Sequence, residues 1–121
     1  MRSRKSLIQE ADRVFSLYVR NRGERFGYNN CFTCGLYLPV EELQAGHFLS
    51  RRFTNTRWHP VNVWAQCNGC NVEKSGNLKI YENKLVKMFG QDVVDALRDL
   101  SHRNDGLTDQ EISEIIKKYK K

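Results

Sequence analysis

The sequence CFTCGLYLPVEELQAGHFLSRRFTNTRWHPVNVWAQCNGCNVEKSGN, residues 31–77, decides the fold of this 121-residue chain. It opens on one Cys-x-x-Cys pair, Cys31 and Cys34, and carries a second pair, Cys67 and Cys70, near its end. In a reducing compartment, four cysteines in two close pairs are more typical of a tetrahedral zinc site than of disulfides. We therefore predict a structural Zn²⁺ ion held by four thiolates, with no open coordination position.

The chain is basic, with a formal net charge of +6. This charge favours a polyanionic partner, and nucleic acid is the commonest one. Clusters of Lys and Arg are also typical of solvated helix ends, so the net charge alone does not decide the partner. No early apolar run is long enough for a signal peptide, and no stretch approaches the roughly 20 apolar residues of a membrane span. We expect a cytosolic protein without membrane contact.

The segment before the first cysteine pair has the pattern of one amphipathic helix. From about residue 5 to 22, apolar residues recur at steps of three and four, which places them on a single helix face. These residues are Leu7, Ile8, Ala11, Val14, Phe15, Tyr18 and Val19. Gly23 and Gly27 then predict a loop that leads to the first cysteine pair.

Between the two cysteine pairs the sequence predicts short strands. We expect one strand within residues 36–40 and another within 43–49, the latter carrying His47. Residues 50–60 are polar and basic, which indicates a loop. Apolar and polar residues then alternate over residues 61–66, and this period of two predicts a strand that leads into the second cysteine pair. A helix from about Asn68 would complete a ββα unit.

The remaining third of the chain has helical patterns. Apolar residues continue at helical spacing to Gly90, and a further short helix follows Asp92. Thr108 and Glu111 have the spacing of a capping box, which predicts that the last helix starts at Asp109. We predict an α+β fold in a single domain over residues 1–121. It would comprise an N-terminal helix and lead-in loop (1–30), a zinc-bound ββα core (31–77) and a helical tail (78–121).

Any catalysis must come from residues other than the cysteines, because a zinc ion with four thiolates has no free position. Phosphodiester hydrolysis needs a base for water and a hard cation for the phosphate. Histidine suits the first task because its pKa lies near neutrality, and an amide oxygen suits Mg²⁺. We expect His47 to face Asn71 across the core. Asn62 is expected to hydrogen-bond the backbone that carries His47.

Four cations in or beside this region are candidate phosphate contacts: Arg51, Arg52, Arg57 and Lys74. Lys74 follows Asn71 by about one helical turn, so the two side chains can share a face. Solvated loop charge is the alternative explanation, above all for Arg51 and Arg52. The two tryptophans, Trp58 and Trp64, either stack on unpaired bases or pack against the zinc-binding turns.

These motifs resemble the HNH, or ββα-metal, nuclease superfamily. The resemblance includes the pattern N-x-x-x-x-C-x-x-C-[HN], which runs from Asn62 to Asn71. More narrowly, AGHF (45–48), TRWHPVNVWAQCNGCN (56–71) and SGN (75–77) are similar to the phage recombination nucleases of the NinG/Rap family. The similarity extends over nearly the whole chain, because that family also has a helix before the first cysteine pair and a helical tail.

The resemblance implies a metal-dependent DNA endonuclease that acts on branched recombination DNA such as Holliday junctions or D-loops. It implies that His47 is the general base, that Asn62 orients it, and that Asn71 is a ligand of a catalytic Mg²⁺ or Mn²⁺. Symmetrical cutting of a four-way junction needs two active sites, so a homodimer in the host cytoplasm is expected. The alternatives are a homing or restriction-like HNH nuclease, and a non-catalytic zinc ribbon that binds nucleic acid or protein.

One position departs from the superfamily pattern. Many HNH enzymes have an acidic metal ligand directly before the catalytic histidine, and this chain has Gly46 there. The second ligand would then be Gln44, Glu73 or His59, or only water and phosphate. His59 is equally a candidate phosphate contact, although a surface residue is its commoner explanation.

Overall fold

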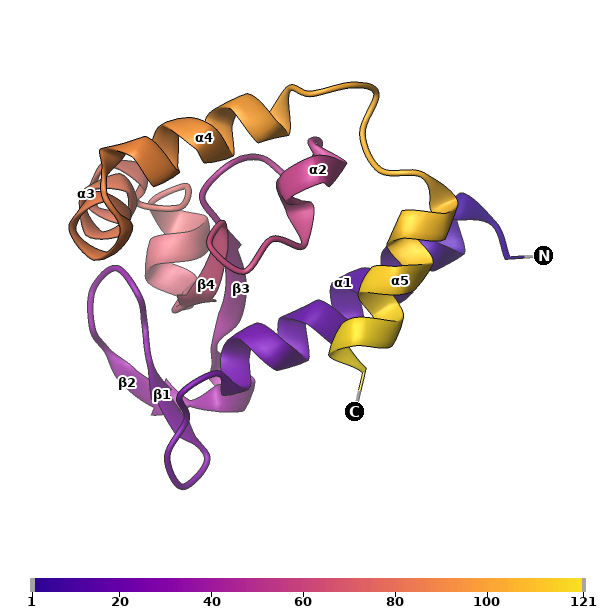
Figure 1. Ribbon diagram of the computed structural model, residues 1–121. Coiled ribbons are helices and arrows are strands. Elements are labelled where there is room, and N and C mark those ends of the chain that lie inside the picture. Colours follow the sequence, from indigo (N-terminus) through magenta and orange to yellow (C-terminus); the bar gives the residue numbers. More distant parts are fainter. Residues whose placement is uncertain (1, 121) are drawn as a thin grey trace.

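The computed structural model describes residues 2–120 and shows a small α+β protein with two antiparallel pairs of strands, of which β3–β4 lies among the helices and β1–β2 lies at the edge of the molecule (Figure 1). The predicted α+β class is therefore confirmed. In chain order the elements are α1 (Arg4–Asn21), β1 (Tyr28–Asn30), β2 (Tyr37–Pro39), a 3-10 turn (Val40–Glu42), β3 (Gln44–His47), α2 (Thr54–Arg57), β4 (Val63–Gln66), a π-helical turn (Gly69–Glu73), α3 (Leu78–Phe89), α4 (Gln91–Ser101) and α5 (Asp109–Tyr119).

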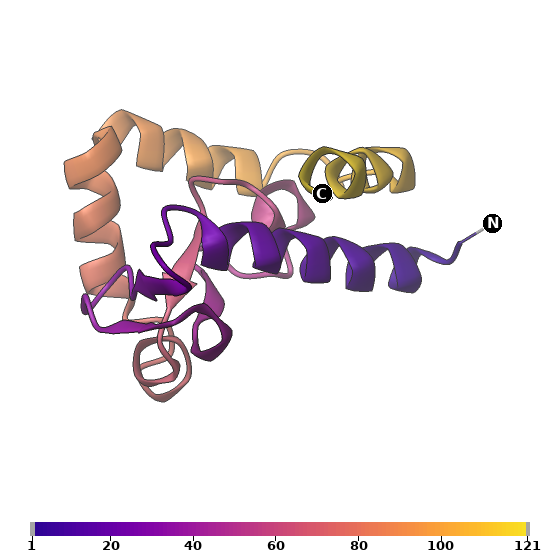
Figure 2. The same cartoon turned by 90° about the horizontal axis from the view of Figure 1, so that it is seen from below.

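The first and last helices, α1 and α5, lie side by side (Figures 1 and 2). The predicted apolar face of α1 is buried against Ile112 and Ile116 of α5. The capping box at the start of α5 is confirmed, because Thr108 Oγ1 accepts from the Glu111 amide at 3.2 Å. Glu111 Oε1 in turn accepts from the Thr108 amide at 2.9 Å. The two ends of the chain are thus joined through one apolar seam.

The hairpin of β3 and β4 is the centre of the molecule. Its register pairs Ala45 with Ala65 and His47 with Val63. Because side chains alternate along a strand, Ala65 and Val63 face the core under α1, whereas Trp64 faces Tyr81 of α3. His47 therefore lies at the end of β3, on the face that α1 covers.

The chain after this hairpin does not form the predicted ββα core. Beyond Cys67 it forms the five-residue π-helical turn and not the α-helix expected from about Asn68. Ser75, Gly76 and Asn77 then have φ values of 50°, 94° and 50°. Three consecutive residues with positive φ cannot continue a right-handed helix, so the chain changes direction before α3 begins.

Two further short elements lie in segments that were expected to be loops. Strand β1 pairs with β2 across the first cysteine pair, and α2 forms a single turn between β3 and β4. Neither has a periodic apolar pattern of its own. Both are held by contacts with distant residues, which a local pattern does not reveal.

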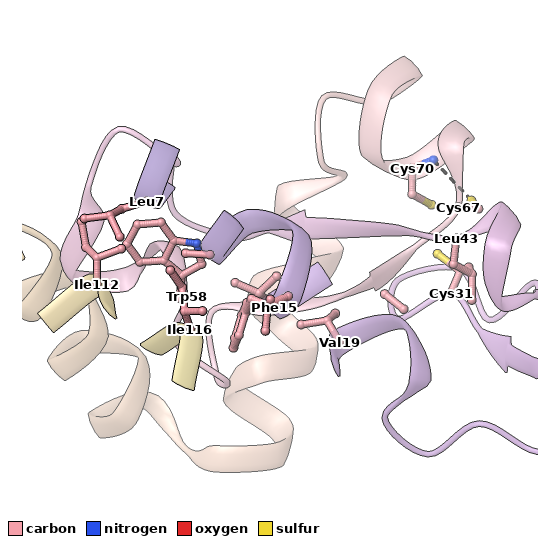
Figure 3. Close-up of a cluster of buried hydrophobic side chains, with 14 residues drawn as sticks. Leu7, Phe15, Val19, Cys31, Leu43, Trp58, Cys67, Cys70, Ile112 and Ile116 are labelled. Atoms are coloured by element: carbon pink, nitrogen blue, oxygen red, sulfur yellow. Dashed lines mark hydrogen bonds between the residues drawn. The ribbon is translucent and has the colours of Figure 1, made fainter. Parts of the chain in front are cut away.

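Two buried clusters form the core. The larger runs from the α1–α5 seam along β3 and β4 to the cysteines (Figure 3). The smaller joins Tyr81 and Leu85 of α3 to Val94 and Leu97 of α4 and to Phe48 after β3. The hairpin is thus fixed from both faces. None of the helices in residues 2–120 is long and apolar enough to cross a bilayer.

Candidate metal centre and adjoining cleft

The four cysteines come together as predicted. Their sulfur atoms all lie within 4.8 Å of one another, and Cys34 Sγ is 3.7 Å from Cys67 Sγ. A tetrahedron with Zn–S bonds of about 2.3 Å has an edge of about 3.8 Å, so the spacing fits. Figure 3 shows Cys31, Cys67 and Cys70 at one end of the larger buried cluster. The group can bind a metal ion such as zinc.

Among the described residues, several N–H groups point at these sulfur atoms, and two of them come from the region of the second cysteine pair. The Cys70 amide donates to Cys67 Sγ at 3.4 Å, and Asn77 Nδ2 donates to Cys70 Sγ at 3.6 Å. Donors of this kind stabilise thiolates that ligate a metal. The role of Asn77 was not foreseen from the sequence, although Asn is one of the few residues enriched at positive φ.

The second cysteine pair also sets the position of Asn71. The Asn71 amide donates to the Cys67 carbonyl at 2.9 Å, and its side chain reaches back toward β3. There Asn71 Nδ2 donates to Gln44 Oε1 at 2.7 Å. Its Oδ1 receives no hydrogen bond from residues 2–120 and is therefore available to a ligand.

Asn71 and His47 line the same cleft, which has a volume of about 660 Å³. We call it the His47 cleft. Its walls come from α1, β3, the loop after β3 and the region of the π-helical turn. The lining residues with polar side chains are Asp12, Ser16, Arg20, Gln44, His47, Arg51, Trp58, Asn71 and Ser75. The predicted pair of His47 and Asn71 is thus brought together, with α1 forming a wall that the sequence did not indicate.

The imidazole of His47 has a defined orientation. Its Nε2 donates to the carbonyl oxygen of Arg57 at 2.8 Å, and because a carbonyl only accepts, Nε2 carries the proton. Burial lowers the pKa of His47 to about 4, although the bond to Arg57 opposes this change. At neutral pH the ring is therefore neutral, and Nδ1 is left as its proton acceptor.

Asn62 is fully buried and lies one residue before β4. Its Oδ1 accepts from the Leu49 amide at 2.8 Å, and its Nδ2 donates to the carbonyls of Leu49 (3.2 Å) and Thr56 (3.0 Å). The side chain therefore joins the two ends of the loop after His47. It acts on the backbone around His47 and makes no hydrogen bond to the ring.

Asp12 of α1 was missed by the sequence analysis. Its carboxylate accepts from Arg57 Nε at 2.9 Å, from Arg57 Nη2 at 2.6 Å and from Trp58 Nε1 at 2.9 Å. A signal was present, because Asp12 follows Ile8 by four residues and precedes Phe15 by three, which places it on the apolar face. A carboxylate on a buried face needs partners, and such a residue is a candidate for a specific role.

The four predicted cations have different surroundings. Arg51 is exposed and lines the His47 cleft, whereas Arg52 is exposed and lies over the Phe53 ring. The Arg57 side chain is only 17% exposed and is engaged by Asp12. Lys74 is exposed at the end of the π-helical turn and does not line the cleft.

Of the three candidates for a second metal ligand, only Gln44 lines the cleft. Glu73 accepts from Asn68 at 3.4 Å outside it. His59 also lies elsewhere, where its Nδ1 accepts from the Val61 amide and its pKa is lowered by burial and by Lys118. At Gly46 a Cβ would lie 1.9 Å from Gln66 Oε1, so this position has no room for a carboxylate.

Both tryptophans pack within the protein. Trp58 is buried, and its indole N–H is bound to Asp12. The Trp64 ring stacks on Phe32 with centroids 4.7 Å apart, and the Arg22 guanidinium lies 3.7 Å from its centroid. These contacts favour the packing explanation over stacking on bases.

The chain is similar to phage proteins along its whole length. The family model described as Bacteriophage Lambda NinG protein matches residues 1–121. Protein ninG of Escherichia phage 933W is 29% identical over 120 residues, which are 98% of this chain and 57% of that protein. Protein ninG of Escherichia phage lambda is 28% identical over 120 residues, 98% of this chain and 56% of that protein. Protein ninG of Salmonella phage P22 is 28% identical with shares of 98% and 57%.

The chain thus spans little more than half the length of these relatives. No solved structure matches it. No HNH nuclease family matches either, so the assignment to the HNH superfamily was wrong, and the NinG model takes its place. The similarity of short motifs around the cysteines had suggested a superfamily that the comparison of the whole chain does not support.

Proposed function

This chain belongs to the NinG family of phage proteins, and we propose that it is a metal-dependent endonuclease that hydrolyses phosphodiester bonds in DNA. The names of the relatives state no activity, so the proposal rests on the His47 cleft. One observation carries it. His47 donates Nε2–H to the Arg57 carbonyl, which leaves a neutral Nδ1 as proton acceptor in a cleft shared with Asn71.

In the proposed reaction Nδ1 of His47 takes a proton from water as the water oxygen attacks phosphorus. A bond forms between that oxygen and phosphorus, and the bond from phosphorus to the leaving oxygen breaks. The Arg57 carbonyl stabilises the imidazolium that results, because it accepts a hydrogen bond from a ring that has become charged. The leaving oxygen takes up a proton from solvent, and the imidazolium releases its proton to solvent, which restores the base.

A Mg²⁺ or Mn²⁺ ion held by Asn71 would supply neutralisation of charge on the phosphate and on the leaving oxygen. The amide oxygens present at this place suit such an ion. Asn71 Oδ1 is free of hydrogen bonds from residues 2–120 and Gln44 lies beside it, whereas the Asp12 carboxylate already accepts three hydrogen bonds. Mg²⁺ often takes only one or two protein oxygens and completes its shell with water and phosphate.

The basic side chains around the cleft supply the contacts to DNA. Arg51 and Arg20 line the cleft, so they are placed to bind phosphates next to the scissile bond. Arg52 and Lys74 are exposed near the cleft and would bind phosphates further along the DNA strand. Arg57 contributes indirectly, through its pairing with Asp12.

Within DNA, the proposed substrates are branched recombination intermediates such as Holliday junctions or D-loops. The proposed working form is a homodimer in the host cytoplasm, because symmetrical cutting of a four-way junction needs two sites. The relatives are phage proteins, which supports a host cell as the setting but does not select a DNA substrate.

The test incubates the purified protein with Mg²⁺ or Mn²⁺ and with four DNAs: a Holliday junction, a flap, a single strand and a linear duplex. The variants are His47→Ala and, as a matched control, His102→Ala, which removes an exposed histidine outside the cleft. Zinc content and circular dichroism establish that each variant is folded.

We expect the wild type and His102→Ala to cut branched DNA at similar rates and His47→Ala to be slower by about 100-fold or more, the usual contribution of a general base. Cleavage by His47→Ala at the wild-type rate would contradict the assignment. DNA binding without cleavage in either metal would favour a zinc-stabilised binding module instead.

A further inference from the structure

We propose that Asp12 is a positioning residue for His47, acting through Arg57, and that α1 is therefore part of the active site. The geometric link stands on the structure alone, whereas its consequence for catalysis rests on the function proposed above. The Asp12 carboxylate bonds to Arg57 and Trp58, not to the His47 ring. It holds the residue whose carbonyl accepts the His47 Nε2 proton.

The first step of the link is the ion pair between Asp12 and Arg57. Two parallel hydrogen bonds, of 2.9 and 2.6 Å, join the carboxylate to Nε and Nη2 of the guanidinium. Such a two-point contact fixes orientation as well as distance. The side chains are 30% and 17% exposed, so the pair is partly protected from water.

The second step is the anchoring of the backbone around Arg57. Asp12 also accepts from the Trp58 indole at 2.9 Å, and the Trp58 ring is buried in the larger cluster. Arg57 Nη1 donates to the Arg51 carbonyl at 3.0 Å, which closes the loop onto its own start. One carboxylate thus binds two consecutive side chains of the segment that presents the Arg57 carbonyl.

The third step is that α2 cannot hold this carbonyl in place by itself. It is a single helical turn, and its first residue has no side-chain cap. A helix of one turn is unstable without tertiary contacts. The position of the Arg57 carbonyl therefore depends on tertiary contacts. Asp12 binds the Arg57 side chain, Asn62 binds the Thr56 carbonyl, and Asn55 joins α2 to the end of α4.

If the link holds, loss of the Asp12 charge loosens the bond between the Arg57 carbonyl and His47. The ring then exchanges its proton between Nε2 and Nδ1, and it no longer presents Nδ1 to the cleft in one orientation. Nitrogen-15 NMR of the imidazole reports this at neutral pH without any DNA. A protonated nitrogen and an unprotonated nitrogen have well separated shifts, and exchange between the two forms moves the shifts toward each other.

The experiment compares the wild type with Asp12→Asn, which keeps the size of the side chain but removes its charge. Arg57→Lys cuts the same link from its other end, because lysine lacks the planar fork. Asp109→Asn is the matched control, because Asp109 also pairs with an arginine. Its carboxylate lies 2.7 Å from the Arg4 guanidinium, and neither residue lines the cleft. Ile112→Val, a buried change in α5, shows the effect of lowered stability alone.

We expect the two nitrogen shifts of His47 to converge in Asp12→Asn and in Arg57→Lys and to stay unchanged in the two controls. With a cleavable DNA, kcat should fall about 10- to 100-fold in the first two variants with little change in KM, the scale of a misplaced catalytic group. The double variant should lose no more than either single variant, because both changes break one link.

Unchanged His47 shifts in folded Asp12→Asn and Arg57→Lys would overturn the inference, even if the wild type cuts DNA. Convergence of the shifts in a protein that cuts no DNA would support the link and reject the proposed function. If Asp12→Asn does not fold, Arg57→Lys gives the same measurement, and unchanged shifts in it alone would also overturn the inference.

Discussion

His47 Nε2 donates to the carbonyl oxygen of Arg57 at 2.8 Å, and this bond gives the histidine one tautomer and one orientation. The carbonyl belongs to the last residue of α2, which comes after β3 in the chain, whereas the contacts that hold it come from α1 and from the end of the loop before β4. The candidate base is thus defined by three distant segments. A change in any one of them should alter the histidine.

Replacing Asn62 by alanine should destabilise the protein and abolish the order of the loop after His47. The change removes one acceptor and two donor contacts of a fully buried side chain. The amide and the carbonyl of Leu49 lose these partners, whereas the Thr56 carbonyl keeps its bond from the His59 amide. We expect a loss of about 2–4 kcal/mol in the free energy of unfolding, measured by urea denaturation. Asn83→Ala, an exposed change on α3, should alter it by less than about 0.5 kcal/mol. Equal stabilities of the two variants would contradict the role given to Asn62.

Stability should fall between pH 6.5 and 4 because of His47. Burial lowers its pKa from 6.5 to about 4, so between these values the unfolded chain binds a proton that the folded protein does not. The unfolding free energy therefore rises with pH in this window, and the contribution of neutral His47 is lost as the pH falls through it. His47→Gln keeps a donor for the Arg57 carbonyl and cannot be protonated.

The measurement is the urea midpoint at pH 7 and at pH 5 for the wild type and for His47→Gln. The wild type should lose on the order of 1–2 kcal/mol more than the variant between these two pH values. Because other groups titrate equally in both proteins, the difference isolates His47. A variant that is as sensitive to pH as the wild type would show that the histidine is not held neutral by burial.

Several features of the fold can be predicted from local sequence patterns, and others cannot. Helix α1 was predicted from its apolar spacing, and the start of α5 from Thr108 and Glu111, because both signals lie within the element itself. The cysteine cluster was predicted because two pairs of cysteines have few other uses in a reducing compartment. Strand β1 and helix α2 lack such signals, since β1 exists through its pairing with β2, and α2 is held by Asp12 of α1 and by Leu100 of α4.

The same distinction applies to the cleft. The sequence could predict that His47 and Asn71 share one cleft, because the cysteine pairs fix the segment that carries His47 and the turn that carries Asn71. Their proposed roles stay a prediction. Asp12 was not found, because its role depends on how α1 packs against the loop after β3. Its place on the apolar face was visible in the sequence, but its partners Arg57 and Trp58 lie 45 and 46 residues away.

Gln44→Glu should tighten the binding of the proposed catalytic Mg²⁺ ion. Gln44 lies beside Asn71, and a carboxylate there would add a charged oxygen ligand of the kind that Mg²⁺ prefers. The Mg²⁺ concentration for half-maximal cleavage should fall about tenfold, equivalent to about 1.4 kcal/mol. Gln110→Glu on α5 adds the same charge outside the cleft and should leave the value unchanged. A similar shift in both variants would indicate an effect of net charge and not of ligation.

Arg51→Ala should weaken DNA binding without disturbing the fold. Arg51 is exposed, and its backbone, not its side chain, makes the contact to Arg57. If its guanidinium binds one phosphate, the slope of log affinity against log salt should decrease in magnitude by about 1. Arg103→Ala, which removes an exposed arginine outside the cleft, serves as the control. An unchanged slope for Arg51→Ala would place the DNA on another face.

The central claim is that Nδ1 of His47 takes the proton from water, and chemical rescue tests it most directly. The measurement is the single-turnover rate of DNA cleavage by His47→Ala, with and without added imidazole, in Mn²⁺. The rate should fall about 100-fold or more and recover in part as imidazole enters the vacated space in the cleft. Cleavage at the wild-type rate without imidazole would contradict the claim.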